Sequence, residues 1–143
     1  MTTYLLDTNV CIAMINGSSP AIRRRFEQAQ SRGDVTLFSS VVAYELWYGV
    51  EKSRQKEQNA RRVQTFSAGP LEWAVFDDDD AREAGAVRAA LEATGTPIGA
   101  YDVLLAGQAR RRGAVLVTSN TGEFARVSDL TLEDWAVPVD TAR

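Results

Sequence analysis

The stretch Ala114-Val115-Leu116-Val117-Thr118 decides which class of fold the chain can adopt. Its three central residues are aliphatic, and two of them are β-branched, which predicts a strand. A strand without polar positions is buried on both faces, as strands of parallel sheets are. A second apolar run, Thr3-Tyr4-Leu5-Leu6, lies near the start of the chain and ends at Asp7. These two runs predict neighbouring elements of a parallel sheet.

Segments with strand and helix character alternate along the rest of the chain. Further strands are expected at residues 35–38 and 71–76, with a short last strand at residues 137–139. Helices are expected at residues 10–15, 20–32, 41–48, 55–67, 81–94 and from 97 to about 112, several of them preceded by Ser, Thr or Asp caps. The alternation predicts an α/β, Rossmann-like three-layer sandwich, with a mainly parallel sheet of four to five strands flanked by helices.

Composition limits the chemistry that is available. The chain has 143 residues, 45% of them hydrophobic, and a net charge of −3, which fits one globular domain over residues 1–143. No apolar stretch approaches the roughly 18 residues of a membrane span, and the first residues lack a basic leader, so we expect a cytoplasmic protein. Histidine is absent and Cys11 is the one cysteine, which excludes imidazole catalysis and Cys/His zinc sites.

Three acidic residues lie where a charge is costly. Asp7 directly follows the first strand, and Glu45 and Asp102 lie within otherwise apolar helical segments. Burying a carboxylate is expensive unless it is paired, neutralised or bound to a cation. No basic residue lies within one turn of Asp102, or within one turn before Glu45. Because ligands bind beyond the carboxyl ends of parallel strands, we expect these acids to converge there with Asn120, which follows the fourth strand.

Each acid alone also has an ordinary structural explanation. Asp7 could cap the next helix, Glu45 could be solvated or pair with Lys52, and Asp102 could interact with its helix dipole. Together they favour a site for a hard cation, because Mg²⁺ and Mn²⁺ prefer oxygen ligands. Such ions activate water and stabilise displacement at phosphorus. A bound cation would also let an acidic protein attract phosphate.

Five short motifs follow one another over nearly the whole chain: Leu5-Leu6-Asp7-Thr8-Asn9, Glu45-Leu46-Trp47-Tyr48-Gly49-Val50-Glu51-Lys52-Ser53, Ile98-Gly99-Ala100-Tyr101-Asp102, Leu116-Val117-Thr118-Ser119-Asn120-Thr121-Gly122-Glu123-Phe124 and Leu132-Glu133-Asp134-Trp135. The ordered set resembles the PIN-domain ribonucleases of the VapC toxin type. The resemblance implies a Mg²⁺- or Mn²⁺-dependent endoribonuclease that hydrolyses RNA, leaves 5′-phosphate and 3′-hydroxyl ends, and inhibits translation. It also implies a homodimer, a VapB-like antitoxin that joins it in a heteromeric complex, and an RNA substrate such as a tRNA.

The resemblance places the family's acids on Asp7, Glu45 and Asp102, which would hold the metal. The position where many PIN domains carry a fourth acid holds Asn120, which we expect to take part in catalysis through a water. This departure leaves the second metal site in doubt. Glu123, one turn further on, is either the missing carboxylate or a surface residue.

Other residues are weaker candidates. Supporting roles at the site are expected for Thr8, Asn9, Thr118 and Glu123. Trp47 and Tyr48 either stack on bases, line a groove for the antitoxin, or pack in the core. Arg110, Arg111 and Arg112 are either contacts to RNA or antitoxin, or a solvated helix end. The run Asp77 to Asp80 is expected to favour a helix N-terminus rather than to bind metal.

Two other functional classes remain to be weighed. A haloacid-dehalogenase-like phosphatase needs a second aspartate where this chain has Asn9, and a receiver domain needs paired acids and a lysine that are missing here. A catalytically impaired PIN-fold module that only binds RNA or protein is the other alternative. Uncompensated acids argue against it, because a binding module has no need of them.

Overall fold

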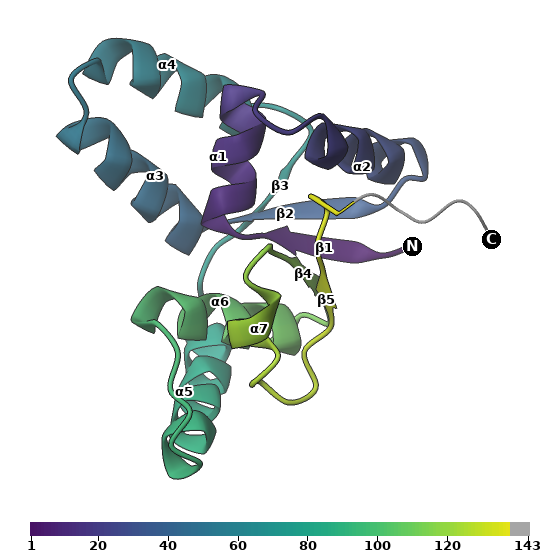
Figure 1. Ribbon diagram of the computed structural model, residues 1–143, viewed down its shortest axis with the longest axis vertical. Coiled ribbons are helices and arrows are strands. Elements are labelled where there is room, and N and C mark those ends of the chain that lie inside the picture. The colour runs from purple at the N-terminus through teal and green to yellow at the C-terminus, as the bar shows by residue number, and fades with distance from the viewer. Residues whose placement is uncertain (138–143) are drawn as a thin grey trace.

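The structure is a computed structural model that describes residues 1–137, and within this range five parallel strands form one sheet in the order β3-β2-β1-β4-β5. The strands are β1 (Thr3–Leu6), β2 (Val35–Ser39), β3 (Glu72–Ala74), β4 (Val115–Val117) and β5 (Leu132–Glu133). The helices are α1 (Thr8–Asn16), α2 (Pro20–Ser31), α3 (Ser40–Lys52), α4 (Lys56–Ser67), α5 (Asp78–Ala93), α6 (Ala100–Arg111) and α7 (Thr121–Phe124). In Figure 1, α1 to α4 lie above the strands and α5 to α7 below them. The predicted α/β class, with its parallel sheet between helical layers, is confirmed.

Several helices start where the sequence predicts a cap. The side chains of Asp7, Ser19 and Ser39 each accept a hydrogen bond from a backbone N–H in the first turn of α1, α2 and α3. Asp77 and Asp80 form a reciprocal capping box at the start of α5, as the run of four aspartates suggested. These caps fix the points where the chain leaves the sheet, and Asp7 and Ser39 therefore lie directly at strand ends.

Some predicted boundaries are wrong. The helix expected from Pro97 begins at Ala100, because Gly99 is extended (φ −57°, ψ 150°) and the Pro97 carbonyl accepts a hydrogen bond from Arg126 instead. A strand lies at Leu132–Glu133, where none was expected. The strand expected at residues 137–139 lies outside the described residues except for Val137. The one-turn helix α7 was not expected from the sequence.

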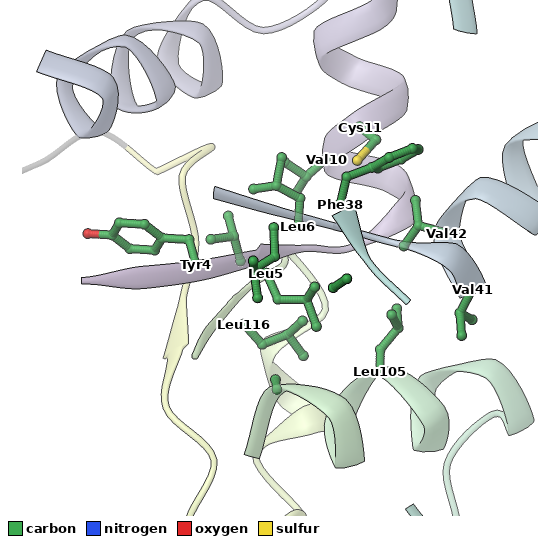
Figure 2. Close-up of a cluster of buried hydrophobic side chains, with 14 of the residues drawn as sticks. Tyr4, Leu5, Leu6, Val10, Cys11, Phe38, Val41, Val42, Leu105 and Leu116 are labelled. Carbon is green, nitrogen blue, oxygen red and sulfur yellow. The ribbon is translucent and has the colours of Figure 1, made fainter. Parts of the chain in front are cut away.

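The core lies on both faces of β1 (Figure 2). Leu6 packs with Val10 and Cys11 of α1, and Leu5 on the opposite face packs toward Leu105 of α6. All of these side chains are at most 2% exposed. The buried state of Cys11 was expected. Since β1 is central and covered on both faces, the chain that leaves its carboxyl end is held rigidly. None of the helices within residues 1–137 combines the length and apolar character needed to cross a bilayer.

The strand order creates one switch point. The chain runs outward from β1 to β2 and β3 on one side, and then returns to place β4 and β5 on the other side. At such a point the connections leave the sheet in opposite directions, and a crevice opens beyond the carboxyl ends of the strands. Here that crevice lies beyond β1 and β4, where Asp7 and Thr118 follow the two strands.

Candidate active site

Asp7 is held rigidly at the end of β1. Its backbone N–H donates to the Val117 carbonyl (3.0 Å), and its side chain accepts a hydrogen bond from the Val10 N–H (2.9 Å). The capping role is therefore real, but it uses only one carboxylate oxygen, Oδ1. Burial raises the pKa of Asp7, against the lowering effect of hydrogen bonds from Thr118 and Val10, and the negative charges of Glu45 and Asp134 raise it further. No cation offsets that cost in the described residues.

Glu45 reaches the same region from α3. The Thr8 hydroxyl, at the start of α1, donates to Glu45 Oε1 at 2.7 Å. This bond joins the first residue of α1 to the second turn of α3, two helices that leave neighbouring strands, and it leaves Oε2 for a ligand. Glu45 is half-buried, and no ion pair to it is formed within residues 1–137. Lys52, considered as its partner from the sequence, lies over the Tyr48 ring at 5.2 Å instead.

Asp102 lies in the first turn of α6, with its carboxylate folded back over Gly99. A Cβ atom at Gly99 would lie 3.2 Å from Asp102 Oδ2, so the glycine makes room for this carboxylate. Burial raises the pKa of Asp102 to about 6, and the charges of Glu123, Glu45 and Asp7 add to the shift. The structure therefore brings Asp7, Glu45 and Asp102 within electrostatic reach of one another, as the strand-end argument predicts.

The loop after β4 completes this edge of the site. Thr118 is fully buried, and its hydroxyl oxygen accepts a hydrogen bond from the Asn120 N–H at 3.0 Å. The Asn120 amide nitrogen donates to Glu123, which is the second cause of the raised pKa of Asp102 after burial. Glu123 thus lies close enough to Asp102 for its charge to act on that carboxylate. Asn9, in contrast, is exposed in the first turn of α1.

Asp134 is a residue at this edge that the sequence reasoning did not single out as a site residue. It follows β5, and its charge contributes to the raised pKa of Asp7. The Ser119 hydroxyl donates to its Oδ1 at 3.2 Å, which links the ends of β4 and β5. The strand-end rule would have found it if a strand had been expected at Leu132–Glu133, which the sequence reasoning did not predict.

The oxygen atoms of Asp7, Glu45 and Asp102 are the donors that a divalent cation would meet at this site. Within residues 1–137, no three acidic or cysteine side chains close up into a complete metal-binding group. A dedicated all-protein cage is not what Mg²⁺ requires, because the ion keeps several waters and is bound through one or two carboxylates and substrate phosphates. Oxygen-only donors, uncompensated charge and raised pKa values all fit such an ion. Asp7, Glu45 and Asp102 are the residues that could hold it.

Among the weaker candidates, the two aromatic residues lie at the surface of α3, and the arginines pair with other parts of the fold. Trp47 and Tyr48 are 36% and 58% exposed on α3, so the core-packing explanation for them is wrong. Arg110 donates to the Ser128 carbonyl and pairs with Glu83. Arg111 and Arg112 both pair with Asp80, which is 0% exposed. These three arginines therefore hold parts of the fold together, and their proposed contacts to RNA or antitoxin gain no support from the geometry.

Comparisons with known proteins agree with this geometry. The model of the family described as "PIN domain" matches residues 4–130. The chain is 39% identical over 136 residues to the tRNA(fMet)-specific endonuclease VapC of Shigella flexneri, covering 95% of this chain and 100% of that protein. It is 42% identical to the protein of the same name from Salmonella typhimurium, covering 94% and 99%. The solved structure of VapBC2 from Rickettsia felis, bound to a DNA fragment from its promoter, superimposes with a TM-score of 0.87 at 36% identity, covering 94% and 99%.

A parallel sheet with acids gathered at its switch point is the architecture of the PIN domain, and the chain belongs to this family. Within the PIN-domain family the chain belongs with the VapC toxins, because VapC proteins are the relatives that it matches over nearly their whole length. The chain is a VapC-type endoribonuclease of the toxin–antitoxin class, as the sequence motifs indicated.

Proposed function

We propose that Asp7, Glu45 and Asp102 form a Mg²⁺- or Mn²⁺-dependent site that hydrolyses phosphodiester bonds of RNA, with Asn120 and Glu123 completing it. The observation that carries the proposal is the meeting of three uncompensated acids, two with raised pKa values, at the switch point of the sheet. A cation relieves the repulsion that these acids exert on one another, so the site is most stable when loaded. We treat residues 1–143 as the single domain that carries this activity.

When bound, the cation supplies an activated water and stabilises the charge that develops at phosphorus. The chain supplies the orientation. Asp7 Oδ1 is fixed by the Val10 N–H, and Glu45 Oε1 is fixed by the Thr8 hydroxyl, so both carboxylates are preorganised by groups that do not themselves react. The Asn120 amide nitrogen donates to Glu123, which leaves the amide oxygen to accept a hydrogen bond from a bound water.

The substrate that we propose is the initiator tRNA. The relatives from Shigella flexneri and Salmonella typhimurium are named as tRNA(fMet)-specific endonucleases and match over 95% and 94% of this chain. Cleavage of this tRNA would stop translation at initiation, which is a sufficient basis for toxicity. The reaction would take place in the cytoplasm, where translation occurs.

The partner that we propose is a VapB-like antitoxin, in a heteromeric complex with a toxin homodimer. Solved relatives are VapBC assemblies from Rickettsia felis and Salmonella typhimurium, both bound to DNA. In this chain a hollow of about 580 Å³ lies among α1, α2 and α4, with Met14, Phe26 and Phe66 in its wall and Arg23, Arg61 and Arg62 around it. An apolar wall bordered by arginines suits a peptide segment with apolar and acidic side chains.

Cleavage of an initiator tRNA transcript by the purified, antitoxin-free chain tests the site. We expect cutting with Mg²⁺ or Mn²⁺, none with EDTA, and a loss of about 100-fold or more in Asp7→Asn and Asp102→Ala, because each removes a proposed ligand. Asp78→Asn is the matched control, since its side chain is 79% exposed on α5 and its loss should leave the rate unchanged. Circular dichroism would show whether each variant is folded.

Two results would contradict the proposal. Full activity in Asp7→Asn would show that the three acids are not the active site. Metal-independent binding of RNA, with no cutting of any RNA under either metal, would favour the alternative of a catalytically impaired binding module. That alternative rests on Asn120, an amide at the position where many PIN domains carry a fourth acid. If it holds, Asn120→Asp is expected to restore cutting.

A further inference from the structure

Two exposed tyrosines bridge the helices that carry Glu45 and Asp102. Tyr44 precedes Glu45 on α3, and Tyr101 precedes Asp102 on α6. Their hydroxyls lie 3.1 Å apart, and their ring centroids are 5.4 Å apart with the planes tilted by 50°. The two side chains, called here the tyrosine bridge, are 54% and 44% exposed. The bridge therefore lies at the surface, immediately beside the proposed active site.

Stability does not explain the bridge. A hydrogen bond between two exposed hydroxyls replaces equivalent bonds to water and adds little to folding. Both rings leave about half of their surface in solvent, so they contribute only partly to the core. Large aromatic side chains left exposed and adjacent to a site are typical of a ligand-contact surface.

The bridge continues along one face of α3. Tyr44, Tyr48 and Lys52 are spaced four residues apart, so they lie on the same face of the helix. Tyr48 is 58% exposed, and the Lys52 ammonium lies over its ring. Starting from the acids, the face thus offers two tyrosine rings of α3 and then a cation. Aromatic rings bind unpaired bases of any sequence, and a cation beyond them complements a phosphate.

We propose that Tyr44 and Tyr101 form a base-stacking platform for unpaired nucleotides next to the scissile phosphate, and that Tyr48 and Lys52 extend it along α3. The inference rests on the proposed function, because it names how that site selects its RNA. Unpaired loop bases are the occupant, since sequence-specific RNA recognition uses splayed bases stacked on aromatic side chains. The bridge also ties the second turn of α3 to the first turn of α6, so a stacked base would be held at a fixed distance from Glu45 and Asp102.

Kinetics with the initiator tRNA transcript test the platform. Tyr44→Leu and Tyr101→Leu remove the rings and are expected to raise KM about 10- to 100-fold, with a smaller change in kcat. Tyr44→Phe and Tyr101→Phe keep the rings and should recover most of that loss. Trp73→Leu is the matched control, because Trp73 is 49% exposed on the edge strand β3, where its ring packs on Phe38 and takes no part in the tyrosine bridge, and its loss should leave KM unchanged.

A modified substrate separates stacking from a purely structural role. Replacing single loop nucleotides by abasic ones should weaken binding to the unmodified chain at one or two positions. At those positions the leucine variants should lose nothing more, because the stacking partner is already missing. The inference would be overturned if the abasic and the leucine substitutions weakened binding additively. It would also be overturned if the leucine variants had an unchanged KM.

Binding of uncut RNA keeps this test independent of the nuclease proposal. Fluorescence anisotropy in the Asp7→Asn background measures affinity with no cleavage, and adding Tyr101→Leu should weaken it by about 10-fold or more. If the wild-type chain cuts nothing but this loss is seen, the nuclease proposal fails and the platform stands. If RNA affinity is unchanged while the leucine variants alter the oligomeric state or antitoxin binding, the face is a protein interface and the platform is overturned.

Discussion

Two groups of acids near the sheet differ in whether they have cationic partners. Asp80, at the start of α5, is fully buried and is held by Arg111 (2.6 Å), Arg112 (3.0 Å) and Gln108 (3.0 Å). Asp7, Glu45 and Asp102, beyond the strands, have no cation beside them within residues 1–137.

The pKa values record this difference. The guanidinium groups of Arg112 and Arg111 outweigh the raising effect of burial and lower the pKa of Asp80 to about 2, whereas burial raises that of Asp102 to about 6. Asp80, which we call the satisfied acid, has cationic partners and stabilises the fold. Asp7, Glu45 and Asp102, which we call the unsatisfied acids, have no cationic partner among the described residues and can bind a cation.

The largest expected change in stability comes from removing the carboxylate of Asp80 from its arginine and glutamine partners. Asp80→Ala should lower the free energy of unfolding by about 3 kcal/mol, because it leaves Gln108 buried without its carboxylate partner and Arg111 and Arg112 without their anion. Urea unfolding followed by circular dichroism would measure the loss. Asp78→Ala is the matched control on the same helix turn, where an exposed ion pair with Arg82 is worth less than about 1 kcal/mol. Equal losses in the two variants would contradict the distinction between the groups.

The sequence indicated the unsatisfied group more readily than the satisfied one. Asp7, Glu45 and Asp102 could be found because each interrupts an apolar run, and the carboxyl ends of parallel strands meet at one edge. The burial of Asp80 could not, because the arginines that hold it lie more than 30 residues further along the chain and reach it only through the packing of α6 on α5.

The tyrosine bridge was hidden for the same reason. Tyr44 and Tyr101 are 57 residues apart, and only the meeting of α3 and α6 brings their hydroxyls together. Asp134 was missed for a different reason, since no strand was expected at Leu132–Glu133, directly before it. Long-range pairing and element boundaries are the two kinds of information that local sequence patterns do not contain.

The charge of the unsatisfied acid Asp102 should lower the stability of the metal-free protein, and replacing this carboxylate by a neutral amide should restore it. The pKa of Asp102 lies above the ordinary value of 3.8, so the folded chain binds its proton more tightly than the unfolded chain does. Stability therefore falls as the pH rises from about 4 to 6. In the metal-free protein, Asp102→Asn should raise the melting temperature at pH 7.5 by roughly 3 °C after allowance for solvent screening, while abolishing cleavage.

Thermal unfolding at two pH values checks this sign. At pH 4 the wild-type carboxyl is largely protonated, so the variant and the wild type should melt within about 1 °C of each other. Asp80 contributes in the opposite direction, because its stabilisation is present above pH 4 and is lost as the pH falls toward 2. A variant that melts below the wild type at pH 7.5 would show that Asp102 is satisfied in the folded chain, and the comparison between the two groups would fail.

The smallest expected change in stability comes from a substitution that moves only the carboxylate of Asp102. Gly99→Ala places a Cβ atom 3.2 Å from Asp102 Oδ2, so the carboxylate has to move by a few tenths of an ångström. The backbone at Gly99 (φ −57°, ψ 150°) suits alanine, so the free energy of unfolding should change by less than about 0.5 kcal/mol. Cleavage of the tRNA transcript should nevertheless fall by about 10-fold, because a metal ligand is displaced without being removed.

Gly122→Ala is the control for this change. Gly122 belongs to α7 in the same region of the site, but a Cβ atom there would meet no atom within 4 Å, so activity should stay at the wild-type level. A wild-type rate in Gly99→Ala would mean that the position of Asp102 is not critical to within a few tenths of an ångström. Equal losses of activity in both variants would instead point to a general sensitivity of the loops around α6 and α7, and not to the placement of one carboxylate.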